Sequence, residues 1–304
     1  MTKEKLQKLM EEFSDKSSLN YLGGKGGAHE QASADLNNYA KNNLISDPNS
    51  LKIDEGNMLK GMRFFQRPIF SAAKADDPDF LVIKQPKVVG EHHFMPKDWL
   101  PGAKTVISVF LPIERSTVEA NKKDPVEPAL EWVYTRVDGQ QFLLALGAHI
   151  RDALIAEGYK AVTPYTEDRF IMRVGGEATS GTEHIPQFSS NWSERHVGVA
   201  AGLGTFGLST NFISRAGSAG RLISVVTDWE AEPDKKDYSD WLGYCNRCKA
   251  CIRLCPPQAH FEDKEGKDHA ACGAFIGKVS EKHAPRYGCG KCMVNVPCED
   301  RAMR

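Results

Sequence analysis

Apolar side chains recur at helical spacing in three parts of the chain. The first part predicts an amphipathic helix over residues 3–14, whose apolar side chains are Leu6, Leu9, Met10 and Phe13. A longer helix is predicted over residues 139–157, and Gly158 suits its C-terminal cap. Ser193 is typical of an N-cap and predicts a third helix that reaches about residue 201.

Three apolar runs rich in β-branched residues predict buried strands instead. They cover residues 104–111, 159–163 and 221–228. Strands that alternate with helices predict an α/β layered domain over residues 96–235. Residues 1–95 are predicted to form an N-terminal helical and irregular extension, because the stretch after the first helix is polar. A polar stretch over 229–240 predicts a linker to a C-terminal domain over 236–304.

Composition excludes several broad classes of protein. The chain has 304 residues, which leaves room for about two domains, and its formal net charge is −1. Without a strong basic field, binding to a nucleic-acid duplex is disfavoured. No apolar stretch approaches the roughly 18 residues of a membrane span, and the charged N-terminal stretch does not resemble a secretory signal. We therefore expect a cytoplasmic protein with reduced thiols, in an anaerobic setting.

The strongest chemical signal is the distribution of cysteines. All eight lie between Cys245 and Cys298. The first four form a C-x2-C-x2-C-x3-C-P run from Cys245 to Pro256, the spacing that wraps a cubane iron–sulfur cluster. Eight thiolates make two sets of four, so we expect two [4Fe–4S] clusters in a ferredoxin-like tail. Zinc is the weaker alternative, because it prefers two separated C-x2-C knuckles, often with histidine.

The spacing also predicts which cysteines share a cluster. Three closely spaced cysteines can reach three corners of one cubane, and the fourth cysteine of such a run ligates the neighbouring cluster. The predicted sets are Cys245, Cys248, Cys251 and Cys298 for one cluster, and Cys255, Cys272, Cys289 and Cys292 for the other. The crossing of Cys255 and Cys298 depends on a stretched second motif, in which five residues separate Cys292 from Cys298 where three are usual.

A glycine-rich stretch from Gly202 to Gly207 matches G-x-G-x-x-G. A dinucleotide site needs a strand before this motif and a helix after it. Here a helix-like stretch precedes the glycines, so NAD binding is disfavoured. The glycines still indicate that the backbone comes close to something, either a ligand or another segment of the chain.

Several segments stand out together with the cysteine run. They are Glu194-Arg195, Ala201–Gly204 with Gly207, Ala216–Gly220, Thr227-Asp228, Cys272-Gly-Ala-Phe275 and Arg286-Tyr-Gly-Cys-Gly-Lys-Cys292. In this combination the chain resembles the epoxyqueuosine reductases, a family that shares its organisation with the corrinoid-dependent reductive dehalogenases. The likeness covers roughly residues 95–298.

The resemblance implies a nitroreductase-like α/β (α+β) domain that binds a base-off cobalamin, followed by the ferredoxin-like tail. It implies that a low-potential donor such as ferredoxin or flavodoxin supplies electrons through the clusters to a Co(I) corrinoid, which reduces a small-molecule substrate. The cofactor-binding candidates that it implies are Asn191, Trp192, Gly202, Gly204, Thr205, Gly207, Ala216, Gly217 and Gly220. For Trp192, simple core packing is an open alternative.

The sequence departs from the family at the aspartate of an Asp-Ser-Ala-Pro element, which acts as the proton donor of epoxyqueuosine reductases. Phe188 stands at about that position, which predicts a substrate other than epoxyqueuosine. The dehalogenases use a tyrosine acid beside a basic residue that lowers the pKa of the phenol. The candidates here are Tyr134 and Tyr165 as the acid, with Arg136, Arg169 or Arg173 beside it.

Three functions stay open from the sequence. The first is a cobalamin-dependent, double [4Fe–4S] reductase. The second is a ferredoxin-like electron-transfer protein that reduces a partner's cofactor without binding cobalamin itself. A flavin reductase ranks last, because no residue specifies flavin contacts. His184 and His196 are each either a lower cobalt ligand or a packing histidine.

Overall fold

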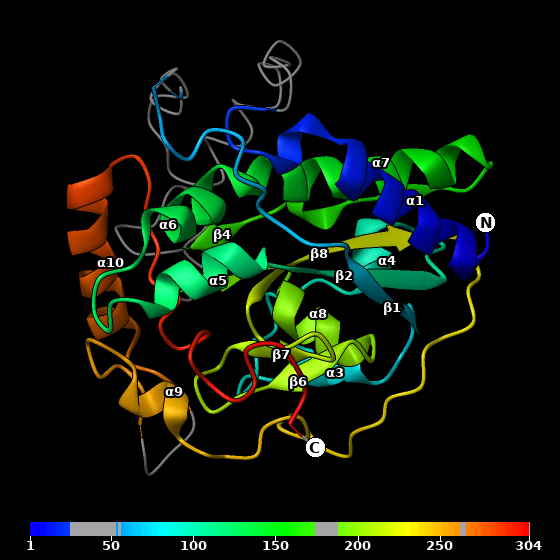
Figure 1. The fold of residues 1–304 in the computed structure, drawn as a ribbon. Coiled ribbons are helices and arrows are strands. Elements are labelled where there is room, and N and C mark those ends of the chain that lie inside the picture. Colours follow the sequence, from blue (N-terminus) through cyan, green and yellow to red (C-terminus); the bar gives the residue numbers. More distant parts are fainter. Residues whose placement is uncertain (25–52, 54–55, 174–187, 262–265, 304) are drawn as a thin grey trace.

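The computed structural model describes residues 1–24, 53, 56–173, 188–261 and 266–303. At its centre lies a four-stranded sheet in the order β1-β2-β8-β3 (Figure 1). The strands are β1 (Ile69–Lys74), β2 (Thr105–Pro112), β3 (Ala161–Val162) and β8 (Gly220–Thr227). The three strands predicted from the apolar runs are confirmed, although β3 is only 2 residues long.

Every pairing in this sheet is antiparallel. The fold is therefore mixed α/β, as predicted, but its strands do not form the parallel sheet that alternating strands and helices often build. Strand β1 was not predicted, because its buried residues are Ser71, Ala72 and Ala73 and not β-branched.

The side chains of β2 alternate between the two faces of the sheet. Ile107, Val109 and Leu111 belong to the core cluster that also contains side chains of α1 (Lys3–Lys16) and α7 (Gly139–Ala156). Val106 belongs to a second cluster, built with α3 (Asp79–Ile83), α4 (Pro96–Trp99) and α8 (Glu194–Ala200). In Figure 1, α1 and α7 lie above the sheet, and α8 and α3 lie below it.

All three predicted helices are present as α1, α7 and α8. Gly158 follows α7 with φ of 87°, the left-handed conformation expected of a glycine cap. Ser193 does occupy the N-cap of α8, but its hydroxyl makes no capping bond. It lies 2.7 Å from His196 Nδ1 instead.

The remaining elements lie outside the four-stranded sheet. They are the helices α5 (Arg115–Lys122), α6 (Leu130–Val137), α9 (Ala250–Arg253) and α10 (His269–His283), the 3-10 turns Ser18–Asn20 and Pro164–Thr166, and two antiparallel strand pairs, β4 (Met172–Arg173) with β5 (Ser189–Ser190) and β6 (Gly204–Phe206) with β7 (Phe212–Ser214). None of the helices in these described ranges has the length and apolar character that crossing a bilayer requires.

The predicted linker over 229–240 is extended but packed on the sheet. Trp229 and Ala231 are buried, and the Asp234 N–H donates to the Ala72 carbonyl at 2.7 Å. The predicted extension over residues 1–95 likewise supplies β1 to the sheet and α1 to the core. The boundaries at 95 and 235 stay predictions, while these contacts join the three segments into one packed unit.

Candidate functional site

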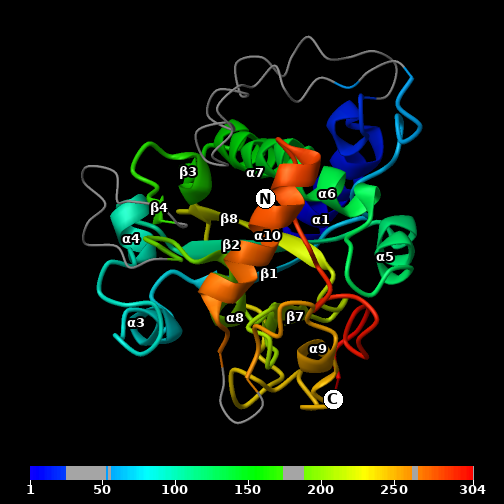
Figure 2. The ribbon, with the colours of Figure 1, turned by 90° about the vertical axis from the view of Figure 1, so that its left-hand side faces the viewer.

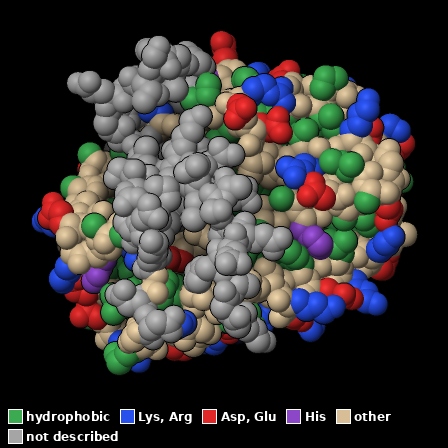
Figure 3. Space-filling view, turned by 90° about the horizontal axis from the view of Figure 1, so that it is seen from above, with side chains coloured by type: hydrophobic (Ala, Val, Ile, Leu, Met, Phe, Trp, Pro, Cys, Tyr) green, Lys and Arg blue, Asp and Glu red, His purple; other side chains and the backbone are tan. Residues whose placement is uncertain are grey.

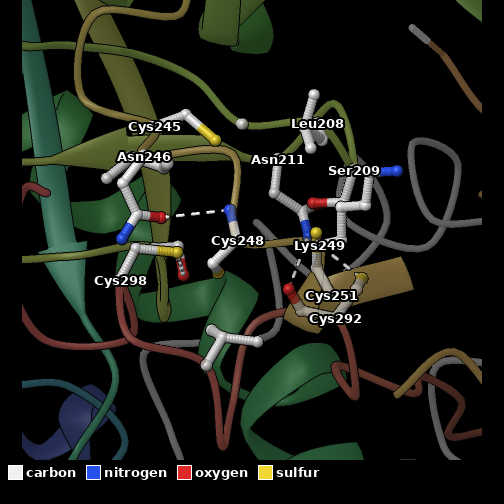
Figure 4. Close-up of a pocket in the computed structure, with 14 residues that line it drawn as sticks. Leu208, Ser209, Asn211, Cys245, Asn246, Cys248, Lys249, Cys251, Cys292 and Cys298 are labelled. Atoms are coloured by element: carbon white, nitrogen blue, oxygen red, sulfur yellow. Dashed lines mark hydrogen bonds between the residues drawn. The ribbon is translucent and has the colours of Figure 1, made fainter. Parts of the chain in front are cut away.

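The cysteines of the first predicted set lie around one small pocket. We call Cys245, Cys248, Cys251 and Cys298 the first thiol set, and Cys255, Cys272, Cys289 and Cys292 the second thiol set. All four members of the first set line the cavity, together with Cys292 and the loop that joins β6 to β7 (Figure 4).

Local backbone geometry brings the first three of these cysteines together. Arg247 and Lys249, the residues on either side of Cys248, have φ of 56° and 59°. A left-handed residue reverses the chain locally, so the two residues form a tight turn around Cys248. The carbonyl of Cys298 accepts from the Ser218 N–H at 2.8 Å, which attaches the last cysteine of the set to the start of β8.

The electrostatic neighbours of each thiol separate the cysteines into the two predicted sets. Burial raises the pKa of Cys298 to about 11, and the thiols that raise it further are Cys245, Cys251 and Cys248. Burial raises the pKa of Cys289 to about 11, with added repulsion from Cys272 and Cys255. Burial raises the pKa of Cys292 to about 12, where Cys289 and Cys255 contribute. These neighbours agree with the predicted crossing of Cys255 and Cys298, and their ligation of two clusters stays a prediction.

Hydrogen bonds to sulfur differ between the sets. In the second set, Asn211 Nδ2 donates to Cys292 Sγ at 3.0 Å and the Ala259 N–H donates to Cys255 Sγ at 3.3 Å. In the first set, Cys298 Sγ lies 3.9 Å from the Ser218 hydroxyl. Such bonds favour the charged sulfur and tune the potential of an attached cluster.

Buried contacts from α5 and α6 hold the second half of the tail in place. Arg286 forms a buried two-point ion pair with Asp138, at 2.7 and 2.8 Å. Lys291 Nζ donates to the Asn121 carbonyl at 2.6 Å, and Asn121 Nδ2 donates to the Cys289 carbonyl at 3.0 Å. The sequence analysis did not predict these contacts, because the sequence does not show which charged side chains are buried in the folded protein.

Gly290, inside the Cys-Gly-Lys-Cys turn, is required by packing. Its φ is 70°, and a Cβ at this position would lie less than 3.0 Å from the indole of Trp132 on α6. This contact fixes the turn that presents Cys289 and Cys292. Among the residues that the structure describes, no three of the His, Cys, Asp and Glu side chains gather around a single metal ion.

The glycines predicted to bind a cofactor are close to other segments of the chain. A Cβ at Gly204 would meet the Ile213 carbonyl, one at Gly217 would meet Glu299, and one at Gly220 would meet Phe110, all at less than 3.0 Å. The sequence left open whether these glycines allow close approach of a ligand or of another segment of the chain. Close approach of another segment accounts for these three glycines. Their contact with a cofactor stays a prediction.

The other members of that predicted group also have partners in the protein. Gly202 is left-handed, Gly207 packs beside Ile213, and the Ala216 N–H donates to Ser214. The Thr205 hydroxyl accepts from the Tyr244 N–H at 2.9 Å and so attaches β6 to the start of the cysteine run.

Asn191 and Trp192 are core residues. Trp192 Nε1 donates to the Ser224 hydroxyl at 2.8 Å, and the indole stacks with Phe80 at 6.2 Å between ring centres. Asn191 Nδ2 donates to the Arg169 carbonyl at 2.7 Å. The packing alternative is confirmed for Trp192.

The predicted pairing of Arg169 with a catalytic tyrosine stays a prediction, because the hydrogen bonds of Arg169 go to the backbone. Arg169 donates to the carbonyls of Asp98 and Trp99, at 2.8 and 2.9 Å, and is therefore committed to α4. The phenol of Tyr134 instead accepts from Asn57 Nδ2 at 2.9 Å, with the guanidinium of Arg286 over its ring.

Tyr165 lies in a polar group that we call the Tyr165 cluster: Tyr165, Glu194, Arg136, Arg221 and Tyr287. Burial raises the pKa of Tyr165, while Arg221 and Arg136 oppose the rise. Arg221 donates to the Arg136 carbonyl at 3.1 Å, and Arg136 stacks on Tyr287 at 4.9 Å. The cationic neighbours of Tyr165 are thus Arg221 and Arg136.

Glu194 is the functional candidate that sequence reasoning missed. Both of its carboxyl oxygens are buried, and neither has a hydrogen-bond partner within bonding distance among the described residues. Burial raises the pKa of Glu194 to about 7, although Ser224 nearby favours the charged form. The sequence feature that could have identified Glu194 is its place in the Glu194-Arg195 pair, at the start of α8.

The remaining predicted candidates are a phenylalanine and two histidines. Phe188 is left-handed, with φ of 61°, and stacks on His269 at 4.7 Å. His196 packs against Phe206 and Trp241, and burial lowers its pKa to about 3. The packing alternative therefore accounts for His196. His184 lies outside the described residues.

Comparison with known proteins gives distant matches. No protein-family model matches the chain. A tetrachloroethene reductive dehalogenase of Desulfitobacterium hafniense is 34% identical over 98 residues, which cover 31% of this chain and 18% of that protein. The chain thus matches less than a fifth of that relative's length, and it is a distant homologue of a dehalogenase over this segment.

Solved structures give a similar picture. A selenomethionine-labelled epoxyqueuosine reductase is 19% identical, with a TM-score of 0.48 over 90% of this chain and 68% of that one. A catabolic reductive dehalogenase in complex with 3-bromo-4-hydroxybenzoic acid is 16% identical, with a TM-score of 0.45 over 99% of this chain and 36% of that one. Similarity at this level leaves the function to be argued from the site.

Proposed function

We propose that this chain is an iron–sulfur oxidoreductase in which each thiol set holds one [4Fe–4S] cluster. The observation that supports the proposal is the set of electrostatic neighbours of each thiol: Cys298 interacts with Cys245, Cys248 and Cys251, whereas Cys255, Cys272, Cys289 and Cys292 interact with one another. Such a crossing of Cys255 and Cys298 between the two sequence motifs is the arrangement of two-cluster ferredoxins.

The residues around the thiols fit clusters of this kind. The donor set is all thiolate, the first set surrounds a cavity, and Asn211 and the Ala259 N–H donate to sulfur. A single zinc ion holds its ligands at roughly 2.3 Å, and no three donors among the described residues gather around such an ion. The first set, which surrounds a pocket, therefore suits a larger inorganic core.

We infer that the clusters pass electrons to a corrinoid, in line with the distant likeness to a reductive dehalogenase. When bound, a corrinoid supplies two-electron reduction chemistry at its cobalt. The Cβ sides of Gly204, Gly217 and Gly220 are filled by the chain, so these glycines would hold a corrinoid only through their backbone. The buried atoms without hydrogen-bond partners that would hold a polar group are the Glu194 carboxyl, Gln140 Nε2 and Arg136 Nη1.

These residues also suit the proton side of a reduction. A carboxyl whose pKa lies near 7 can give up a proton at neutral pH, which suits a general acid. Glu194 meets that condition, and Tyr165 lies near it in the same cluster. The Tyr165 cluster is therefore where we place the small-molecule substrate.

Anaerobic reconstitution with iron, sulfide and hydroxocobalamin tests the proposal. We expect about eight irons and eight sulfides per chain, two paramagnetic centres after reduction, and a corrinoid absorption that stays with the protein through gel filtration. Stoichiometric zinc with no sulfide would overturn the iron–sulfur assignment. Clusters without retained corrinoid would overturn the second part alone.

A second candidate function rests on the filled glycine positions. If Gly204, Gly217 and Gly220 serve only the packing of the chain, the protein is an electron-transfer protein that reduces the cofactor of a partner. This candidate predicts the same iron and sulfide content but no retained corrinoid. The gel-filtration experiment therefore separates the two candidates directly.

A further inference from the structure

The cysteine run is a positively charged segment of the sequence between Asp240 and Glu262. From Leu242 to Phe261 the sequence contains three cationic residues, Arg247, Lys249 and Arg253, and no aspartate or glutamate. The whole chain has a net charge of −1, so this positive stretch is a local feature. A local surplus of one sign attracts partners of the opposite sign.

These cations surround the most accessible thiol. Cys248 is exposed, whereas the other seven cysteines are buried or half-buried. Arg247 and Arg253 are exposed, Lys249 is half-buried, and Arg253 Nη1 donates to the Cys248 carbonyl at 3.0 Å. The left-handed turns at 247 and 249 let the cations reach solvent while Cys248 lines the cavity of the first thiol set.

Acidic side chains of the adjoining C-terminal segment are already paired. Asp300 lies 3.1 Å from Arg115 and 3.2 Å from Arg301, and Glu299 lies 2.5 Å from Lys122. Figures 1 and 2 place α9 and this segment at one end of the molecule, away from α1 and α7. On the α1 and α7 side, Figure 3 shows basic and acidic side chains interspersed wherever described residues are visible.

We propose that the face formed by Arg247, Cys248, Lys249 and Arg253 docks a small, acidic, low-potential electron-carrier protein. The inference rests on the proposed iron–sulfur function. In the docked pair, one electron leaves the reduced carrier and enters the cluster of the first thiol set, and no atom is transferred. Opposite charges orient the two proteins and raise the association rate, and Cys248 gives the carrier a short path to the cluster.

The test compares a protein reductant with a small one. The reconstituted protein is reduced under anaerobic stopped flow by a reduced, acidic two-iron ferredoxin, or by photoreduced deazaflavin, which needs no protein docking. We expect Arg247→Glu to lower the second-order rate with ferredoxin about tenfold at low salt and to flatten its salt dependence. The deazaflavin reaction should keep its wild-type rate.

Lys8→Glu is the matched control, because Lys8 is an exposed cation on α1, at the other end of the molecule. It should leave both rates unchanged. Equal ferredoxin rates for wild type and Arg247→Glu at low salt would overturn the proposal. If Arg247→Glu loses iron, Arg253→Gln replaces it, with a smaller expected drop. A wild-type protein that neither reductant reduces would instead show that the iron–sulfur function itself is wrong.

Discussion

The two thiol sets are bound into the molecule by different surroundings. The first set lies beside hydroxyl groups, Ser209 and Ser218, and reaches solvent at Cys248. The second set has cationic neighbours: Arg195 on α8 is electrostatically coupled to Cys292, and Lys291 to Cys289. A reduced cluster carries more negative charge, so buried cations favour reduction of the second set.

The different surroundings of the two thiol sets imply a direction of electron flow between the two proposed clusters. The cations near the first set are largely in solvent, where salt screens them, whereas Arg195 and Lys291 are much less accessible to water. We therefore expect the cluster of the second set to have the higher potential. Electrons that enter at Cys248 would then move inward, toward the side of the molecule where Arg195 and Glu194 begin α8.

The largest difference between the two thiol sets is expected from Gly290→Ala, which should affect only the second set. The added Cβ collides with Trp132, and φ at this position is 70°. Overpacking and the left-handed backbone together cost on the order of 3 kcal/mol, so the turn with Cys289 and Cys292 should distort and half of the iron should be lost. Gly273→Ala on α10 is the control, because its Cβ meets nothing within 4 Å. Full iron content in Gly290→Ala would contradict this account.

Gly217→Ala should have the opposite effect on the two clusters. A Cβ at Gly217 meets Glu299 and Asp300, next to Cys298, and φ is 88°. We expect Cys298 to move from the first set, with loss of that cluster and retention of the other. Electron paramagnetic resonance of the two variants should show complementary surviving signals. If both variants lose the same signal, the division into sets is wrong.

Glu194→Gln should remove a pH dependence of stability. The folded carboxyl has a pKa near 7 and the unfolded one near 4.5, so the folded state holds the proton more tightly. Stability is fully present below pH 4.5 and falls as pH rises through 7, by at most about 3 kcal/mol. Thermal unfolding at pH 6 and pH 8.5 should show a smaller drop for the variant than for wild type. Equal drops would remove Glu194 as the buried acid.

Arg195→Gln should give the smallest change, a shift in potential. Loss of the cation beside Cys292 should lower the midpoint of the second cluster by roughly 60 mV, a tenfold change in the equilibrium for a one-electron couple. Arg195→Lys should restore part of the shift, because it restores the charge. A potentiometric titration with both clusters resolved is the measurement, and a shift confined to the first cluster would reverse the proposed order.

Local sequence signals identified the elements that depend on neighbours along the chain. The helices α1, α7 and α8, the strands β2 and β8, and the grouping of the thiols all follow from spacing of 2, 3 or 3.6 residues. Strand β1 escaped notice because Ser71, Ala72 and Ala73 are small, and small side chains suit a crowded interior without marking a strand.

The sequence alone determined the chemistry of the donors and predicted their division into fours, since those depend on residue type and on distance along the backbone. The tertiary structure decided which charges are buried, that Arg169 braces α4, that the Glu194 carboxyl is buried, and that Gly290 meets Trp132. These facts depend on segments far apart in the chain, and burial, which sets the pKa of a carboxyl and the space beside a glycine, arises only when those segments pack together.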